Sequence, residues 1–136
     1  MIILAVDYGD ARTGLAVCDK NEILATALGT VHERYEPLVI EAVKKAALEH
    51  HAECIVVGKP VNMDGSEGER AKKCIEFSQK LHTETGIPCD LYDERMTTMI
   101  AHQSLSFTNT RGKKRKEAVD ALSAQIILQD YIDARK

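Results

Sequence analysis

Residues 2–17 decide the fold of this chain and read IILAVDYGDARTGLAV. The five leading apolar residues indicate a strand buried on both faces, because the run shows no polar alternation. Asp7 follows where this strand leaves the core, and a rigid strand end can hold a carboxylate in the fixed geometry that metal-assisted phosphate chemistry requires. Gly9 and Gly14 allow a tight turn, and Leu15 starts a second apolar run. The stretch predicts a hairpin with an acid at its mouth, but an aspartate that only hydrogen-bonds its own turn fits the same residues.

The rest of the chain alternates short apolar runs with segments of helical spacing. This order predicts an α/β fold with a mixed sheet, in which three antiparallel strands are followed by two parallel strands and helices pack on both faces. Ser66 and Glu69 fit a capping box at the start of one helix, and the segment from Ser106 to Lys116 breaks the helical pattern. The expected strands are 2–6, 13–18, 23–28, 54–57 and 87–92, and the expected helices begin near Pro37, Ser66, Thr98 and residue 117.

Length and charge limit the classes of function. A chain of 136 residues is long enough for one domain with a substantial core, so we expect a single domain over residues 1–136. The 18 basic and 21 acidic residues give a formal net charge of −3, so any contact with nucleic acid has to use a local basic patch. The absence of tryptophan and the low aromatic content argue against base stacking as the main binding device.

Cysteine usage and hydropathy indicate the compartment. The four cysteines stand too far apart for a CxxC pair, which argues against a zinc site. They lie in or beside apolar segments, so we expect buried reduced thiols, as in a cytoplasmic protein. The leading apolar run lacks a basic leader and is stopped by Asp7, and no run approaches membrane-spanning length. Neither a signal peptide nor a membrane segment is therefore expected.

Three acidic positions stand at the ends of predicted elements. Asp7 ends the first strand, Glu94 ends the last strand with Asp93 beside it, and Asp120 lies on one stripe of the final helix with Ala124. Strand ends at one edge of a sheet, with a helix laid across them, can bring the three acids together. Such carboxylates repel one another unless Mg²⁺ or Mn²⁺ is shared between them, and two such ions about 3.5–4 Å apart support phosphodiester hydrolysis. Each acid alone fits a solvated or salt-bridged residue, so the prediction rests on their joint arrangement.

Several motifs follow one another along the whole chain. They are DYG at 7–9 with Arg12 and Gly14, VGKP at 57–60, NMDGSEG at 62–68, DER at 93–95 with Thr97 and Thr98, and DA at 120–121 followed by ILQDY at 127–131. With these motifs in this order, the chain resembles the YqgF/RuvX family, described as pre-16S rRNA nucleases and as Holliday junction resolvases. The resemblance implies an RNase H-like fold and a metal-dependent endonuclease that acts on structured RNA, at the 5′ end of pre-16S rRNA in ribosome biogenesis.

The resemblance also implies which residues carry the chemistry. It assigns Asp7, Glu94 and Asp120 as the catalytic carboxylates and as the ligands of two Mg²⁺ or Mn²⁺ ions. Asp93 remains the alternative to Glu94, because a strand end can bend and alternation alone does not choose between the two. Lys59 stands where the family usually has an apolar residue, a departure that touches none of the acids.

A basic run just before the final helix is the first candidate for holding nucleic acid. It occupies residues 111–116 and lies next to Asp120, where it can contact backbone phosphates, although a solvated loop has the same composition. Arg12 and Arg95 lie close to proposed acids and can orient an acid, contact phosphate or form a structural salt bridge. The expected nucleic-acid-binding residues are Arg12, Lys59, Arg95, Arg111, Lys113, Lys114, Arg115 and Lys116.

Other functions compete with the leading hypothesis. The runner-up keeps the chemistry and changes the substrate to branched DNA, as in a Holliday junction resolvase of recombination and repair. ATP-binding proteins of the actin-like kind share the RNase H-like core, but they need two lobes, and 136 residues supply one. A non-catalytic nucleic-acid-binding module is disfavoured by the three acids. As partners we expect precursor rRNA or branched DNA together with ribosomal or other processing factors, and we expect a monomer or a weak homodimer.

Overall fold

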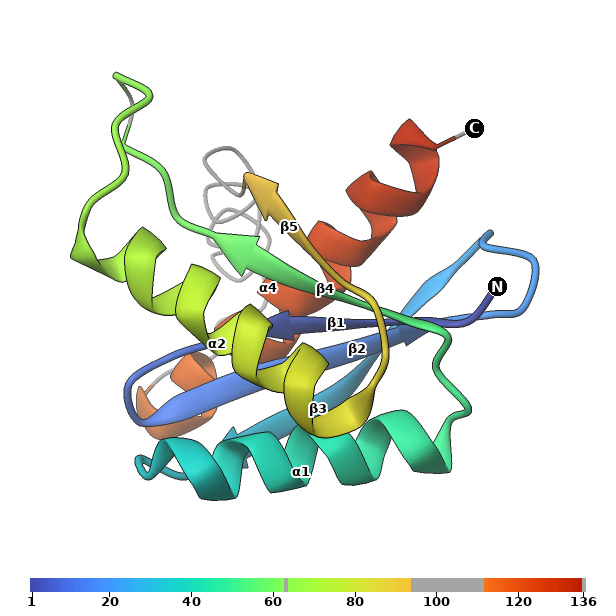
Figure 1. Ribbon diagram of the computed structural model, residues 1–136, viewed down its shortest axis with the longest axis horizontal. Coiled ribbons are helices and arrows are strands. Elements are labelled where there is room, and N and C mark those ends of the chain that lie inside the picture. The colour runs from blue at the N-terminus through green and yellow to red at the C-terminus, as the bar shows by residue number, and fades with distance from the viewer. Residues whose placement is uncertain (63, 94–111, 136) are drawn as a thin grey trace.

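The computed structural model describes residues 1–62, 64–93 and 112–135, and only the backbone of 112–120. Its elements are β1 (Ile3–Asp7), β2 (Arg12–Cys18), β3 (Ala25–His32), α1 (Glu36–Glu49), β4 (Cys54–Lys59), α2 (Glu69–Thr85), β5 (Cys89–Asp93) and α4 (Gly112–Ala134). The described strands form a five-stranded sheet in the order β3-β2-β1-β4-β5 (Figure 1). The β1–β2 and β2–β3 pairs are antiparallel, whereas β4 pairs with β1 and with β5 in parallel, so the predicted mixed sheet is confirmed.

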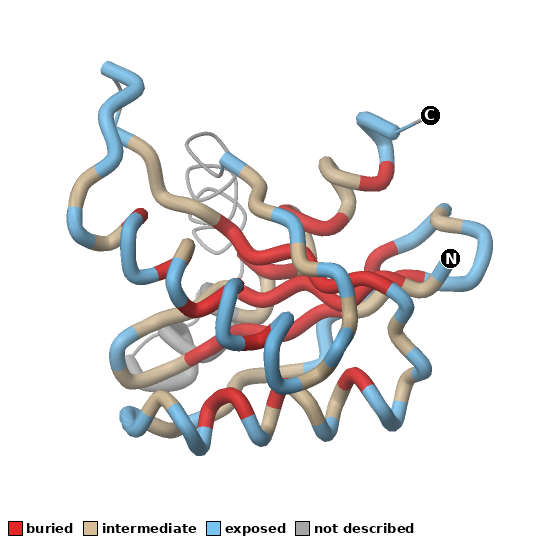
Figure 2. The backbone as a smooth tube through the Cα atoms, viewed as in Figure 1, coloured by how far each residue is buried: buried red, intermediate tan, exposed pale blue. Residues whose placement is uncertain are grey.

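Helices cover both faces of the sheet, as the sequence predicts (Figure 1). Leu4 and Val6 of β1 pack into a core shared with α1 and α2, whereas Ile3 and Ala5 pack into a second core with Leu128 of α4. This split follows from the alternation of side chains along a strand. Figure 2 shows that buried backbone is concentrated in the central strands between the two helical layers. We refer below to the α4 face and the α1/α2 face of the sheet.

The last turns of α4 lie at the start of β1. Arg135 pairs with Glu22 at 3.0 Å, and the same carboxylate pairs with the amino group of Met1 at 3.0 Å. Further back along the helix, the side-chain oxygen of Gln129 accepts the backbone N–H of Ala25 at 2.9 Å. Because a helix is close to a straight rod, the earlier turns of α4 lie toward the opposite edge of the sheet, at which β1 ends (Figure 1).

The loop before α2 differs from the expectation. The helix begins at Glu69 with Gly68 as its N-cap and without a side-chain cap, so the predicted capping box is wrong. Ser66 lies outside the helix, where its hydroxyl donates to Asp64 at 2.6 Å. The same carboxylate accepts the backbone N–H of Ser66 at 2.9 Å. The serine stabilises its own loop because the aspartate two residues before it is the nearer acceptor.

Two further boundaries differ from the prediction. α4 begins at Gly112 and not at residue 117, so residues 112–116 of the basic run are helical. Lysine and arginine are good helix formers, which explains why the helix starts among them. The third strand spans Ala25–His32 and starts later than predicted, because the preceding residues belong to a turn. The helix expected from Thr98 lies outside the described residues.

Burial of the cysteines follows the prediction at three of the four positions. Cys18, Cys54 and Cys74 are buried free thiols, and Cys89 is half-buried. Burial, followed by the neighbouring Cys54, raises the pKa of Cys89 to about 12, which keeps this thiol protonated. Separately, none of the helices in the described part of the chain is long and apolar enough to cross a membrane.

Candidate active site

The carboxyl ends of β1, β4 and β5 meet at one edge of the sheet, because the three strands run parallel. Asp7 is the last residue of β1, Lys59 of β4 and Asp93 of β5. The register pairs Val6 with Val57 and Lys59 with Asp93. In open α/β sheets, ligands bind outside the carboxyl ends of the strands. The structure therefore brings three residues singled out by the sequence to the edge that favours a ligand.

Asp7 lies on the α4 face of this edge. The alternate residues before it, Ile3 and Ala5, pack toward α4, and Asp7 itself is half-buried. Its partner across the β2 ladder is Gly14. The register with β4, continued by one residue, brings Gly58 to its other side. Glycine in a strand is the kind of position at which a ligand can approach the backbone closely.

The two candidate acids at the end of β5 differ in the face to which they belong. Tyr92 packs on the α4 face, where its ring meets the ring of Tyr131 edge-on at a centroid distance of 6.3 Å. The next residue of a strand belongs to the other face, so Asp93 lies on the α1/α2 face, away from Asp7. Asp93 is also exposed. Glu94 lies outside the described residues.

Position 120 lies in the first half of α4. Ala124, Leu128 and Ile132 are fully buried against the α4 face of the sheet. Residue 120 precedes Ala124 by four positions, about one helical turn. The backbone of α4 thus carries Asp120 toward the edge at which β1 ends (Figure 1). Of Asp120, and of Lys113, Lys114, Arg115 and Lys116 before it, only the backbone is described.

The two described basic candidates lie on opposite faces of the sheet. Ala16 and Cys18 of β2 pack toward α4, so Arg12 shares the α4 face with Asp7. Lys59 belongs to the α1/α2 face, and its Nζ pairs with a carboxylate oxygen of Glu67 at 2.7 Å. Arg95 and Arg111 lie outside the described residues.

Arg70, which the sequence analysis did not single out, fixes the turn after Asp7. Its Nη1 pairs with Asp10 at 2.7 Å, and its Nη2 donates to the backbone carbonyl of Tyr8. The guanidinium carbon lies 5.4 Å from the centre of the Tyr8 ring. A Cβ at Gly9 would lie 2.1 Å from a backbone carbonyl oxygen across the turn, so this position requires glycine. Because 60 residues separate Arg70 from Asp10, local sequence patterns carry no signal for this contact.

Tyr8 joins the same turn to α1 and α2. Its ring stacks on Phe77 with centroids 3.9 Å apart and planes inclined by 6°. Its hydroxyl donates to Glu36 at 3.1 Å, and Glu36 also accepts from Lys80 at 2.5 Å. Burial and then the hydrogen bond to Glu36 raise the pKa of Tyr8 to about 12. The residue that follows Asp7 is therefore held on the α1/α2 face, which fixes the end of β1.

Within the described residues, no three His, Cys, Asp or Glu side chains gather closely enough to hold a metal ion. Of the acids that the resemblance assigns as metal ligands, only Asp7 has a described side chain. The described part of the chain thus supplies one carboxylate, its strand edge and the contacts that fix the turn after it.

Comparisons with other proteins agree with this arrangement along the whole chain. The family model described as "RuvX: Holliday junction resolvase" matches residues 1–134. A protein of Clostridium novyi named "Putative pre-16S rRNA nuclease" is 39% identical over 134 residues, which cover 98% of this chain and 99% of the relative. A protein of the same name from Protochlamydia amoebophila is 41% identical over 140 residues, with coverage of 98% and 93%.

Two solved structures of complexes with Holliday junctions share the fold. Thermus thermophilus RuvC in complex with a Holliday junction substrate matches with a TM-score of 0.63 at 15% identity, over 99% of this chain and 95% of that one. The fowlpox virus resolvase in complex with Holliday junction DNA matches with a TM-score of 0.62 at 10% identity, over 99% of both chains. These likenesses confirm the RNase H-like α/β fold. The full-length family match and the relatives near 40% identity show that this chain belongs to the RuvX family.

Proposed function

We propose that this protein is a metal-dependent endonuclease that cleaves structured RNA and processes the 5′ end of precursor 16S rRNA in the cytoplasm. The observation that carries the proposal is the position of Asp7, at the carboxyl end of β1 and beside Gly14 on the α4 face. Relatives that match along the full chain bear the name pre-16S rRNA nuclease, which supports RNA as the substrate class.

Asp7, Glu94 and Asp120 are the catalytic carboxylates of this proposal. Asp7 belongs to the α4 face, whereas Asp93 belongs to the α1/α2 face. The backbone of α4 carries position 120 about one turn before Ala124, which packs on the α4 face. We therefore assign Glu94, and not Asp93, as the second carboxylate, because Asp93 lies on the side of the sheet away from Asp7.

The donor set fits a hard divalent cation. The three proposed ligands are carboxylates, without the sulfur or imidazole that softer metals prefer, and carboxylates in one place need a cation to relieve their repulsion. When bound, two Mg²⁺ or Mn²⁺ ions supply an activated water and charge stabilisation of the leaving oxygen. The chain supplies the geometry, because core packing fixes β1 and Arg70 with Tyr8 fixes the turn after Asp7.

Positive charge on the same face supports binding of the nucleic-acid backbone. Arg12 shares both the edge and the face of Asp7. Residues 112–116 of the basic run form the first turns of α4, where the N-terminal end of the helix dipole also favours phosphate. Arg95 follows Glu94 directly and completes the proposed set. Lys59 is the weakest candidate, because it pairs with Glu67 on the opposite face. Phosphate contacts of this kind position a strand without reading its sequence.

A second candidate function is cleavage of branched DNA. The family model is described as a Holliday junction resolvase, and two junction-cleaving enzymes share the fold at TM-scores of 0.63 and 0.62. The proposed chemistry is the same for both substrates. RNA is the leading proposal because the full-length relatives are near 40% identity, whereas the resolvase structures lie at 15% and 10%.

The test is a cleavage assay of purified protein on a 5′-extended precursor 16S rRNA end and on a four-way DNA junction in parallel. We expect cleavage of the RNA with Mg²⁺ or Mn²⁺ and none in EDTA, with Asp7→Asn protein as the control for contaminating nucleases. Cleavage of the junction alone would transfer the function to the second candidate. Cleavage in EDTA would contradict metal dependence, and folded protein that cuts neither substrate would contradict the nuclease proposal.

A further inference from the structure

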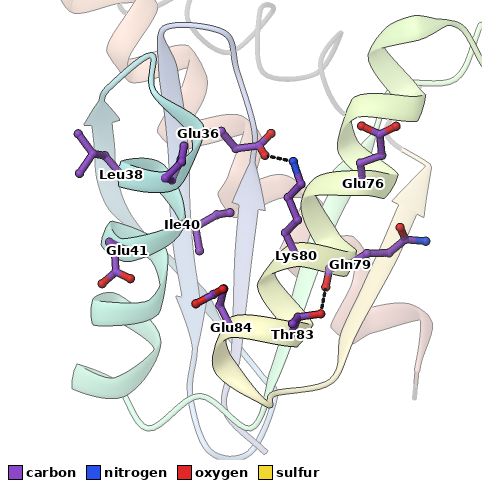
Figure 3. Close-up of a pocket in the computed structure, with 10 residues that line it drawn as sticks. Glu36, Leu38, Ile40, Glu41, Glu76, Gln79, Lys80, Thr83 and Glu84 are labelled. Carbon is purple, nitrogen blue, oxygen red and sulfur yellow. Dashed lines mark hydrogen bonds and ion pairs between the residues drawn. The ribbon is translucent and has the colours of Figure 1, made fainter.

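A groove lies between α1 and α2, on the side of the sheet opposite α4 (Figure 3). Its volume is about 610 Å³, which is within the range of roughly 300–1,000 Å³ seen for ligand sites. Ile40 of α1 and Lys80 and Glu84 of α2 point into the space between the helices (Figure 3). Pro37 and Leu38 line the α1 side, and Leu38 is 52% exposed. The groove thus offers apolar surface between two helices.

The rim of the groove is acidic. Glu36, Glu41, Glu76 and Glu84 line it, and Lys80 is the one basic residue among the ten that do so. Lys80 is already engaged, because its Nζ lies 2.5 Å from a carboxylate oxygen of Glu36, which raises the pKa of Lys80. Among the described residues, no lysine or arginine lies within ion-pair distance of Glu41 or Glu84. The groove therefore carries an excess of negative charge that the described part of the chain does not neutralise.

This combination of charge and apolar surface limits what can bind. Phosphate groups are repelled, so RNA and DNA do not fit the groove. An inorganic cation would pair with the glutamates but would make no apolar contact with Ile40 and Leu38. An amphipathic segment with basic residues around an apolar one matches both properties, and the space between two helices is the usual receptor for such a segment.

We propose that the α1/α2 groove docks a basic amphipathic segment of a partner protein. The lysines or arginines of that segment pair with Glu41 and Glu84, and an apolar side chain between them covers Leu38 and the floor at Ile40. The proposal is independent of the catalytic assignment, because none of the proposed catalytic or nucleic-acid-binding residues lines the groove. Proteins that bind RNA commonly carry basic segments of this kind. The suggestion that the partner also contacts RNA is the one part of this inference that rests on the proposed function.

The test measures peptide binding by fluorescence anisotropy with the full-length protein and no nucleic acid. The probe is a fluorescein-labelled peptide of sequence KLLKKLLKKLLK. Two control peptides separate the contributions: KSSKKSSKKSSK keeps the positive charge without apolar residues, and ELLEELLEELLE reverses the charge. We expect the leucine–lysine peptide to bind at least about tenfold more tightly than either control, because it alone satisfies both the acidic rim and the apolar floor.

Variants with matched controls locate the peptide on the protein. We expect Glu41→Lys with Glu84→Lys to weaken binding at least about tenfold, whereas Glu49→Lys with Glu69→Lys changes it less than about twofold. The control pair also places one exposed glutamate on each helix, but outside the groove. If the charge-reversed protein fails to fold, Glu41→Gln with Glu84→Gln replaces it, with an expected loss of about threefold.

A second pair of variants tests the apolar part of the groove. Leu38→Ser is expected to weaken binding about threefold or more, and Leu48→Ser, on the same helix and 64% exposed, is the matched control. Equal losses in the groove and control variants would overturn the proposal, because bulk negative charge would then explain the binding. Equal affinity for the leucine–lysine and serine–lysine peptides, or absence of binding to folded protein, would overturn it as well.

Discussion

Carboxylates lie near both ends of β1, in different surroundings. At the start of the strand, Glu22 pairs with the amino group of Met1 and with Arg135, each at 3.0 Å, so two cations of the protein itself stabilise its charge. At the other end, Asp7 has glycine positions in both neighbouring strands. The first carboxylate ties the chain start to the last helix, whereas the second lies at the strand edge that binds ligands in folds of this class.

Asp19 extends the contrast at the start of β1. Its side chain accepts the backbone N–H groups of Leu24 and Ile23, each at 2.8 Å, and these donors hold its pKa below the usual range. The pKa of Glu22 is lowered as well, first by the Met1 amino group. Acids whose charge is already satisfied by protein groups stabilise the fold. The comparison teaches that the place of an acid in the fold, and not its exposure, separates a carboxylate at the strand edge that favours a ligand from one that joins two parts of the chain.

The largest expected effect separates the two acids at the end of β5. We expect Glu94→Gln to reduce cleavage about 10³-fold or more, because it removes a proposed metal ligand, and Asp93→Asn to change it less than about threefold. Single-turnover rates on the RNA substrate in Mg²⁺ measure both. The opposite order would show that the strand departs from alternation after Tyr92 and that Asp93 is the ligand.

The next largest effect concerns the anchor of the turn after Asp7. Arg70→Ala removes the ion pair with Asp10 and the donor to the Tyr8 carbonyl, and we expect kcat to fall about 10–100-fold with little change in KM. Arg70→Lys should recover part of the rate, because it keeps the charge. Lys72→Ala, an exposed change on the same helix, is the control. Equal kinetics of the Arg70→Ala and Lys72→Ala proteins would show that the anchor does not position Asp7.

A smaller effect, on binding and not on chemistry, is expected when the basic run is neutralised. Changing Lys113, Lys114, Arg115 and Lys116 to alanine should weaken RNA binding and flatten its dependence on salt. Each lost phosphate contact lowers the slope of log affinity against log salt by roughly 0.7–0.9. The rate of bound substrate should change much less, because these residues are not proposed ligands. An unaltered salt slope would show that the run is a solvated helix start. The contacts with RNA phosphates would then be assigned to Arg12 or Arg95.

The smallest effect tests the structural end of β1. The folded-state pKa of Asp19 lies below 3.8, so the unfolded chain takes up the proton first as the pH falls, and the stabilisation is lost below that value. We expect Asp19→Asn to lower the unfolding temperature at neutral pH by about 3 °C and to show a shallower loss of stability below pH 3.8 than the wild type. Thermal scans across this pH range measure both quantities. If the unfolding temperatures of Asp19→Asn and the wild type depend on pH in the same way, Asp19 does not stabilise the fold through its charge.

Much of the fold could be predicted from the sequence, because its strongest signals are local. The unbroken apolar runs of β1 and β4 and the helical spacing of α1 and α2 fix the type of each element. The errors fall at boundaries. The sequence predicts the start of α2 too early, because Ser66 has a nearer acceptor in Asp64, and the start of α4 too late, because a dense run of charge resembles a loop.

The residues of the candidate site could be predicted only where a local sequence pattern places them at the end of a strand or on a helix. Asp7 can be identified from the sequence, because it ends an apolar run where a strand is predicted to end. Arg70 could not be found, because its partners Tyr8 and Asp10 lie about 60 residues away in the chain. The preference for Glu94 over Asp93 depends on the register of β5 and on the packing of Tyr92 against α4. Neither can be inferred from the five residues of β5 alone.

The most direct test of the central claim compares Asp7→Asn with Asp19→Asn in one cleavage assay and one thermal scan. We expect Asp7→Asn to reduce cleavage at least about 10³-fold, to keep the wild-type unfolding temperature and to lose stabilisation by added Mg²⁺. We expect the reverse for Asp19→Asn, which should cleave normally and unfold at a lower temperature. An Asp7→Asn protein that cleaves at the wild-type rate, or that loses activity only because it unfolds, would contradict the assignment of the end of β1 to function.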